Sequence, residues 1–399
     1  MTYRVSIVQR RLPHYRVPLF EQLRAYLGTH SIELDLLVGQ GTRADSARRD
    51  AGRLEWAIET KSTYVAGTRA CLQHGHAHRR DADLVVLSQE NSLLSNYPLL
   101  FAGRSSRRVA FWGHGANFQR RSAARLSEAL RRWTAQRVDW WFGYTVLSVD
   151  AVVEAGFPRE RITQLDNAAA RLTLRDECAS ISEGEGAAAS TALGLGSGFT
   201  AVALGSLYPE RRIDFLLEAC DQLVRTAPDF QLIVIGAGPE AGKVERAATT
   251  RPWCRYLGPQ VGRPKALYLA MADVMLNPGV VGLGILDAFA SVSPLITTAC
   301  PGHGPEIAYL EEDNGVMTAD DVPSFVEACL RLRADSSALE RLRDGCRSGA
   351  ARYTLERTVG NFADGIRAAL AAPPYRGGGE FDDPSMAQAA CRSRSRSSE

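Results

Sequence analysis

One turn in the second half of the chain has a backbone and neighbouring side chains that suit a diphosphate. Gly282-Leu283-Gly284 precedes a helical pattern, so its N–H groups are unobstructed and the helix dipole adds partial positive charge. Upstream, Arg211 could supply a bidentate, charge-assisted contact to the same phosphates, worth about 1.5–3 kcal/mol. Asp287, in the first turn of the helix, could accept hydrogen bonds from ribose hydroxyls.

Further glycine-bearing turns follow short apolar runs in the same half of the chain. A simpler interpretation stays open, because glycines at strand ends are often only turn residues and an arginine is often a solvated surface charge. The candidate ligand-binding residues are Gly205, Ser206, Gly236, Gly238, Gly258, Val281, Gly282, Leu283 and Gly284.

Residues 236–241 also fit a loose GxGxxA dinucleotide fingerprint. The fingerprint normally follows the first strand of its domain and is completed by an acid at the end of the next strand. Here it follows the second expected strand, and no acid ends the strand expected at 256–257. A nicotinamide or flavin oxidoreductase is therefore the weaker alternative.

Short apolar runs that alternate with helical patterns must position these groups, and such alternation predicts βαβ units with parallel sheets. We expect strands at 4–9, 32–38, 84–88, 109–112, 140–144 and 162–165, and again at 200–205, 231–236, 256–257, 274–277, 294–298 and 315–317. We expect helices at 18–27, 123–137, 213–226, 265–272, 284–291, 322–334, 337–350 and 355–371.

Residues 182–198 are rich in Gly, Ser and Ala, which is typical of a linker between two domains. The sequence therefore predicts a first domain at 1–181, a linker at 182–198 and a second domain at 199–354. A helix at 355–372 could return to the first domain, and 373–399 should be a disordered tail. The default site is the cleft between two doubly wound α/β domains.

The motifs of the second half resemble one family. Residues 205–219, 233–239 and 272–290, continued by Pro305-Glu306-Ile307 and Asn314-Gly315, resemble in order and spacing the nucleotide-sugar-binding domain of GT-B retaining glycosyltransferases of the family 4 type. The resemblance covers about residues 3–370 and is strongest over 200–318. The pattern NPGxVGLGxxDAFA indicates a variant branch.

The resemblance implies a GT-B architecture, with two Rossmann-like domains facing across a cleft. It also implies a retaining, metal-independent hexosyltransferase that uses a UDP- or GDP-linked sugar and no cofactor. Arg211, His114 and Asp287 would be its catalytic residues. The chain departs from the family at Ser206, where an arginine is usual, and at Gly279, where the first of two glutamates falls. These departures leave open a catalytically degenerate binding or scaffold protein.

In the first half, Phe111-Trp-Gly-His-Gly115 follows an expected strand and matches the family's strand-end histidine. His114 would then face the cleft and bind the donor sugar or its phosphate, although a structural histidine in a glycine turn is the alternative. By the same resemblance, 13–18 is the acceptor loop and Asn167-Ala168 the crossover between domains. The acceptor would be a glycan or a lipid-linked acceptor in surface polysaccharide or glycoconjugate synthesis.

Charge is unevenly distributed along the 399 residues, whose formal net charge is +2. Residues 1–180 have 26 Lys and Arg against 18 Asp and Glu, a net charge of +8, so this half should meet something anionic. Residues 119–138 include six arginines and one glutamate around Leu126, Leu130 and Trp133. This pattern fits either a packed helix or a basic amphipathic helix lying on anionic lipid.

Composition and motifs exclude several other classes. Eight scattered cysteines without a CxxC indicate reduced thiols, and no signal peptide or membrane span is expected, so we predict a cytoplasmic or peripheral protein. His74, His76 and His78 alternate without a Cys or carboxylate partner, so we expect no metal. No RNA- or DNA-binding module appears, so nucleic acid is not an expected partner.

Overall fold

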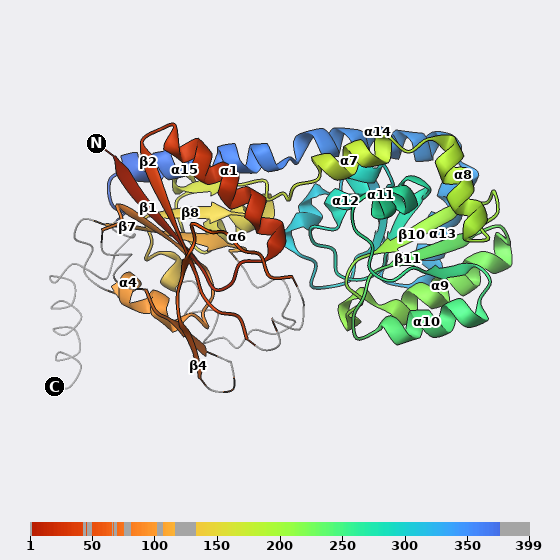
Figure 1. Ribbon diagram of the computed structural model, residues 1–399, viewed down its shortest axis with the longest axis horizontal. Coiled ribbons are helices and arrows are strands. Elements are labelled where there is room, and N and C mark those ends of the chain that lie inside the picture. The colour runs from red at the N-terminus through yellow and green to blue at the C-terminus, as the bar shows by residue number, and fades with distance from the viewer. Residues whose placement is uncertain are drawn as a thin grey trace, which may run out of the picture.

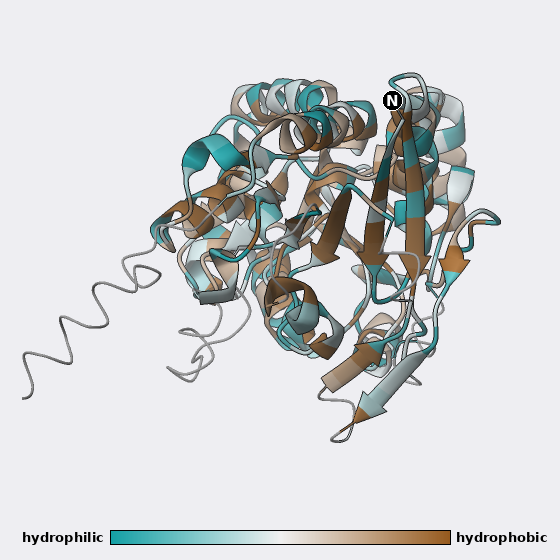
Figure 2. Ribbon diagram, turned by 90° about the vertical axis from the view of Figure 1, so that its left-hand side faces the viewer, coloured by the Kyte–Doolittle hydropathy of each residue, from teal (hydrophilic) through white to brown (hydrophobic). Residues whose placement is uncertain are grey.

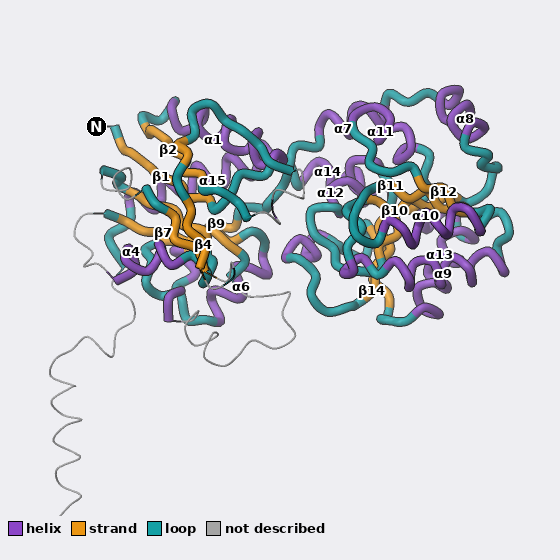
Figure 3. Tube along the Cα trace, turned by 60° about the horizontal axis from the view of Figure 1, so that its bottom comes forward, coloured by secondary structure: helices purple, strands orange, loops and turns teal. Residues whose placement is uncertain are grey.

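The computed structural model describes residues 2–42, 45, 50–65, 67, 70–75, 81–101, 107–115 and 133–375. Two parallel sheets, each flanked by helices, form two domains that lie side by side (Figure 1). In both domains the strands lie inside and the helices outside (Figure 3). This arrangement confirms the predicted fold class of two doubly wound α/β domains.

The first domain has a parallel sheet of seven strands in the order β3-β2-β1-β6-β7-β8-β9. Its strands are mostly apolar and lie inside the domain (Figure 2), as expected for parallel strands covered on both faces. A short antiparallel hairpin, β4 (Ser62–Val65) with β5 (Ala70–Gln73), stands apart from the sheet. The other elements are β1 (Tyr3–Gln9), η1 (His14–Arg16), α1 (Val17–Gly28), β2 (Ile32–Val38), β3 (Ile58–Glu59), β6 (Leu84–Ser88), η2 (Leu94–Asn96), α4 (Tyr97–Phe101), β7 (Arg108–Gly113), β8 (Trp140–Gly143), α6 (Val146–Glu154), η3 (Arg159–Arg161) and β9 (Ile162–Gln164).

The second domain has a parallel sheet of six strands in the order β12-β11-β10-β13-β14-β15. The order of the strands reverses direction between the neighbouring strands β10 and β13. In such folds, ligands bind beside this reversal, at the carboxyl ends of the strands. Its elements are α7 (Leu172–Ala179), α8 (Glu183–Ala192), β10 (Thr200–Leu204), η4 (Pro209–Arg211), α9 (Ile213–Thr226), β11 (Gln231–Ile235), α10 (Ala241–Thr250), β12 (Cys254–Tyr256), α11 (Gly262–Ala270), β13 (Val274–Asn277), α12 (Ile285–Ser291), β14 (Leu295–Thr298), η5 (Pro305–Tyr309), β15 (Gly315–Thr318), α13 (Val322–Ala334) and α14 (Ser336–Arg352).

The last helix, α15 (Leu355–Ala371), returns to the first domain (Figure 1). Thr354 caps it by accepting a hydrogen bond from the N–H of Arg357. Phe362 lies fully buried, with its ring 4.6 Å from that of Phe142 and 5.0 Å from that of Trp112. The apolar face of α15 therefore completes the core of the first domain.

The expected linker at 182–198 is wrong as a structural assignment, because most of it is the helix α8. Ser182 and Glu185 form a capping box, which satisfies the first N–H groups of the helix despite Gly184 and Gly186. The preceding helix α7 packs on α11 and α12, so the chain enters the second domain before α7 and not at the expected linker.

The first three residues of the expected tail, 373–375, pack on the first domain. The N–H of Tyr375 donates to Asp139 Oδ1 at 2.7 Å, and its ring lies 5.1 Å from that of Phe157. Residues 376–399, and residues 119–132 of the predicted basic segment, lie outside the described residues. All cysteines in the described ranges are free thiols.

Candidate active site

Arg211 lies in a pocket of about 260 Å³ at the carboxyl ends of β10 and β13. Its guanidinium packs on Gly205, where an added Cβ would lie 2.9 Å from Nη2 of Arg211. Within the described part of the chain, the Arg211 side chain makes no hydrogen bond or ion pair. Burial lowers the pKa of Arg211, and the charge of Asp287 partly offsets this effect. A partly buried cation without a paired anion favours an anionic ligand.

Gly279 packs against the backbone that carries Arg211. A Cβ at this position would lie 2.1 Å from the carbonyl oxygen of Glu210 and 2.7 Å from Cα of Arg211. The next residue, Val280, donates its N–H to the same carbonyl of Glu210 at 2.9 Å. The glutamate that the resemblance implies therefore has no room here, and Gly279 holds the turn before α12 beside Arg211.

The turn before α12 offers free donors. The N–H groups of Gly282, Leu283 and Gly284 donate to no other protein atom in the ranges that the structure describes. Space is open beside Gly284, where no atom lies within 4 Å of an added Cβ. The N–H of Val281 is not free, because it donates to His303 Nδ1 at 3.0 Å. Its carbonyl accepts a hydrogen bond from the N–H of Gly304. Arg211 and the three free N–H groups together suit phosphate oxygens.

Asp287 is buried and already paired. Lys265 Nζ donates to Asp287 Oδ1 at 2.7 Å, and Arg171 Nε lies 3.0 Å from the same oxygen. Lys265 comes from α11 and Arg171 from the segment before α7, so the pairing joins three parts of the second domain. Neither cation was predicted from the sequence, because nothing in their local sequence distinguishes them from surface charges.

The glycines of the loop after β11 have a packing role. A Cβ at Gly236 would lie 1.8 Å from the carbonyl oxygen of Gly205, and one at Gly238 would lie 2.5 Å from that of Leu207. The loops after β10 and β11 thus require glycine in order to touch, which accounts for the pattern that resembled a dinucleotide fingerprint. Gly258 has a φ of 64° and open space around it, and Ser206 is exposed.

On the first domain, His114 follows β7 and its ring lies 4.6 Å from that of Tyr144. His114 keeps an exposed surface, but neighbouring protein atoms displace part of the water around its ring, and this desolvation together with the charge of Arg16 lowers the pKa of His114 to about 4. It is therefore neutral at pH 7 and could accept or donate one hydrogen bond. A Cβ at Gly115 would lie 2.5 Å from the carbonyl oxygen of Ser148, which explains why glycine follows the histidine.

Within the expected acceptor loop, Arg16 is the residue that reaches the polar groups at the carboxyl end of the sheet. It donates to Gln9 Oε1 and to the hydroxyl of Tyr144, both at 2.7 Å, and its guanidinium lies 4.6 Å from the ring of Trp112. No described carboxylate lies within 4.0 Å of this guanidinium. The resemblance implied an acceptor loop at 13–18 but did not distinguish Arg16 from His14 or Tyr15 within it.

The two domains meet at Asn167 and at η5. The side chain of Asn167 donates to Glu306 Oε1 at 2.8 Å, and its carbonyl accepts from the hydroxyl of Tyr309 at 3.1 Å. Thr145 Oγ1 donates to the carbonyl of Pro305 at 3.0 Å. The sequence pattern included Pro305-Glu306-Ile307 but gave Glu306 no role.

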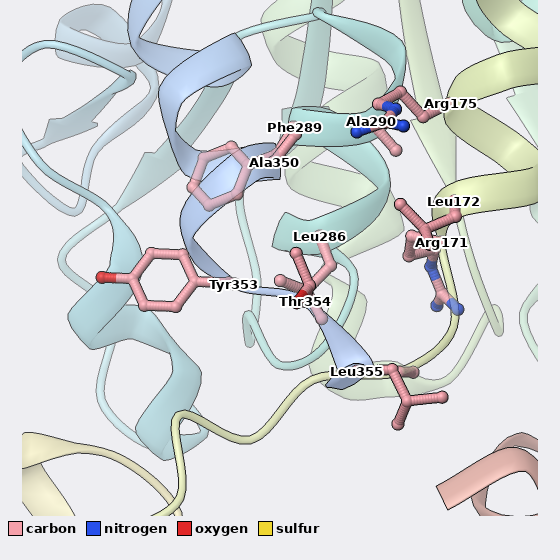
Figure 4. A pocket seen from close by; sticks show the side chains of 11 residues that line it. Arg171, Leu172, Arg175, Leu286, Phe289, Ala290, Ala350, Tyr353, Thr354 and Leu355 are labelled. Carbon is pink, nitrogen blue, oxygen red and sulfur yellow. The ribbon is translucent and has the colours of Figure 1, made fainter. Parts of the chain in front are cut away.

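A groove of about 330 Å³ lies where both connections between the domains pass (Figure 4). Arg171, Leu172 and Arg175 line one side of it, and Tyr353, Thr354 and Leu355 lead into α15. Arg171 thus connects this region to Asp287, so the groove borders the candidate site from the side of the interdomain connection.

Comparison with known proteins supports the motif analysis for part of the chain. Residues 198–335 match the family model described as Glycosyl transferases group 1. A GDP-mannose-dependent alpha-(1-6)-phosphatidylinositol monomannoside mannosyltransferase of Mycolicibacterium smegmatis is 30% identical over 155 residues, which cover 36% of this chain and 40% of the relative. An exopolysaccharide phosphotransferase of Streptomyces coelicolor is 24% identical over 41% of this chain and 18% of that protein. The chain thus spans less than half the length of these curated relatives.

Solved structures match nearly the whole chain. A glycosyltransferase from Rickettsia africae superposes with a TM-score of 0.69 at 9% identity, covering 93% of this chain and 100% of the other. HepE from Anabaena, in complex with UDP, superposes with a TM-score of 0.67 at 13% identity, covering 92% and 100%. The fold is GT-B. The same Anabaena protein bound to UDP-glucose gives a TM-score of 0.65 at 13% identity, with 92% and 99% covered.

The described residues of this GT-B chain contain no cluster of three or more His, Cys, Asp or Glu residues arranged to hold a metal ion. His76 and His78 lie outside the described residues. None of the described helices has the length and apolar character needed to cross a membrane.

Proposed function

We propose that the protein is a glycosyltransferase that transfers a hexose-type sugar from a UDP- or GDP-linked donor with retention of the anomeric configuration. The acceptor is a glycan or a lipid-linked molecule in surface polysaccharide or glycoconjugate synthesis. The observation that carries the proposal is the Arg211 guanidinium, which has no paired anion within the described chain. The backbone of its neighbour Glu210 accepts a hydrogen bond from Val280, in the segment that leads into the turn with three free N–H groups. The group 1 family match over 198–335 and the nucleotide-bound Anabaena structures support it.

In the proposed reaction, Arg211 and the Gly282–Gly284 N–H groups stabilise negative charge that develops on the departing diphosphate. The charges are preorganised, because the backbone contact between Val280 and Glu210 fixes the turn relative to Arg211. Asp287 would accept hydrogen bonds from the ribose hydroxyls and would then share its carboxylate with Lys265 and Arg171. Neutral His114 would hydrogen-bond the sugar or its phosphate from the first domain. This set of groups requires neither a divalent metal nor a cofactor.

The acceptor would bind the first domain, whose excess of positive charge favours an anionic or lipid-phosphate carrier. We place the protein in the cytoplasm, on the inner face of the membrane, with the 119–138 segment on anionic lipid. At the described end of this segment, Trp133 is 39% exposed, and Arg137 lies 4.1 Å from the centre of its ring. Indole and guanidinium groups both suit the headgroup layer.

The decisive experiment measures release of nucleoside diphosphate from a panel of UDP- and GDP-sugars, with an acceptor extract and EDTA present. Release that depends on both donor and acceptor supports the proposal, and ¹H NMR of the product reports the anomeric configuration. Tight binding of a nucleoside diphosphate without turnover would instead indicate the non-catalytic binding protein that Ser206 and Gly279 left open. Loss of activity in EDTA would contradict metal independence.

A further inference from the structure

Glu306 is a buried carboxylate at the boundary between the domains. It lies on η5, and only 5% of its surface is exposed. Among the side chains that the structure describes, its hydrogen-bond partner is the neutral Asn167, which donates to Oε1 at 2.8 Å. No described Lys, Arg or His nitrogen lies within 4.0 Å of the carboxylate, so its charge has no direct counter-ion in the described chain. Such a carboxylate is costly to bury unless polar groups satisfy it.

The second oxygen of this carboxylate is directed toward the candidate donor site. Oε2 would lie 2.8 Å from a Cβ added to Gly304 and 4.0 Å from one added to Gly282. Gly282 carries the first of the three free N–H groups of the turn before α12. Two glycines therefore leave room beside Oε2, on the side where the diphosphate is proposed to bind.

Groups of the first domain lie on the other side of Glu306. The contact between Thr145 and Pro305 fixes η5 against the segment that carries Tyr144. Burial raises the pKa of Glu306, and the hydrogen bond from Asn167 and the charge of Arg16 oppose this shift. The charge of Glu306 likewise acts on Tyr144. Glu306 thus lies between the proposed phosphate turn and the proposed acceptor domain.

The sugar of a bound donor must occupy this same region. It is attached to the phosphate at the turn, and its anomeric carbon must face an acceptor on the first domain. A carboxylate recognises neighbouring sugar hydroxyls through charge-assisted hydrogen bonds, and these are strong where water is excluded. We propose that Glu306 binds hydroxyl groups of the donor sugar and so determines which sugar is transferred. The inference rests on the proposed function and assigns a sugar-recognition residue within it.

The test compares Glu306→Gln with the wild type and with Glu311→Gln, a neighbouring exposed glutamate that pairs with Arg352. The glutamine amide oxygen can still accept from Asn167, so the melting temperature should stay within about 2 °C. We expect the Kd of UDP and GDP to change less than about twofold, because neither carries a sugar. The Kd of the accepted nucleotide sugar, and kcat/KM for transfer, should weaken at least about tenfold. Glu311→Gln should leave all three quantities unchanged.

A second measurement does not depend on the stability of the variant. Donor analogues that lack one hydroxyl each should bind the wild type at least about tenfold more weakly at one or two ring positions. Glu306→Gln should show little further loss at those positions. If wild type and Glu306→Gln bind the nucleotide sugar with equal affinity and turn over normally, Glu306 only binds Asn167. This result would overturn the inference and leave the proposed function standing. A wild type that binds no nucleoside diphosphate would overturn the proposed function, and the inference with it.

Discussion

Lys265 and Asp287 form an ion pair across α11 and α12, with 2.7 Å between the ammonium nitrogen and Oδ1. Arg171 lies on the same carboxylate, so two cations hold it before any ligand arrives. A ribose that binds Asp287 would therefore meet an acceptor group whose orientation is already fixed. Such preorganisation reduces the entropy lost on binding.

Substitution of Asp287 should test this pairing through stability. Asp287→Asn leaves Lys265 and Arg171 without their shared anion in a partly buried setting, so we expect the free energy of unfolding to fall by about 1–3 kcal/mol. Urea denaturation measures the change. Asp214→Asn is the matched control, because Asp214 pairs with Lys243 at an exposed site and should cost less than about 1 kcal/mol. Equal effects of the two variants would contradict a special role for the Asp287 pairs.

Removal of the Arg211 charge should weaken donor binding. Arg211→Gln deletes the cation that lacks a paired anion, and we expect transfer to fall at least about tenfold, as for a lost charge-assisted hydrogen bond. Calorimetry should show the same loss for UDP or GDP. Arg225→Gln, on the exposed side of α9, is the control and should behave as the wild type. Unaltered nucleotide affinity in Arg211→Gln would refute the phosphate role.

Two glycines of the same loop should respond in opposite ways. Gly279→Ala places a Cβ 2.1 Å from the carbonyl of Glu210, so the backbone near Arg211 must shift, and we expect destabilisation by about 1–3 kcal/mol with weaker donor binding. Gly284→Ala meets no atom within 4 Å, at a φ of −61°, and should keep or slightly raise the melting temperature. Thermal denaturation of both variants distinguishes them, and a tolerated Gly279→Ala would contradict the close packing.

The depressed pKa of His114 predicts a pH dependence of stability. Its folded-state pKa of about 4 lies below its ordinary value of 6.5, so the unfolded chain binds a proton between these values that the folded chain does not. The folded state therefore keeps the stability that comes from a neutral His114 above pH 6.5, and it loses that stability as the pH falls toward 4. The melting temperature of the wild type should therefore fall further between about pH 7 and pH 5 than that of His114→Asn. Parallel curves for the two proteins would be inconsistent with a depressed pKa.

Membrane contact would involve the exposed aromatic side chains near the 119–138 segment. Phe101 is 53% exposed, and its ring lies 5.0 Å from that of Trp133. Replacement of both by alanine should reduce recovery with anionic vesicles in a flotation assay, because each aromatic ring contributes to interfacial binding. Tyr26→Ala, at an exposed aromatic on α1, serves as the control. Equal recovery of the wild type with anionic and neutral vesicles would count against the membrane proposal.

Much of the fold follows from local patterns that the chain keeps in three dimensions. The helices at 213–226, 322–334 and 355–371 were predicted with their observed bounds, because each has an apolar stripe and clear ends. The helix α8 was missed because its composition resembles a linker, while the Ser182–Glu185 capping box decides its structure. The predicted start of the strand β12 was two residues too late and its predicted end one residue too late, because Cys254 gives no strong strand signal.

The candidate site was less predictable, because much of it is assembled by tertiary contacts. The motif order grouped Arg211 with the Gly282 turn, and a hydrogen bond from Val280 to Glu210 joins the two segments that carry them. Their joint binding of a diphosphate stays a prediction. The partners of Asp287 come from segments about 20 and 120 residues away, and no local pattern marks them. Glu306 was visible in the motif, but its role depends on Asn167 from the other side of the interdomain connection.

The return of α15 to the first domain has a consequence for synthesis of the chain. Phe362 and Ile366 belong to the core around β1, β6 and β8, so that core stays incomplete until the residues of α15 have left the ribosome. The strands and helices of the six-stranded domain end with α14 at Arg352, and Tyr353, the next residue, still packs in its core. The segment translated first is therefore the one that finishes folding last, and a nascent chain truncated before residue 355 would expose the apolar surface that α15 covers.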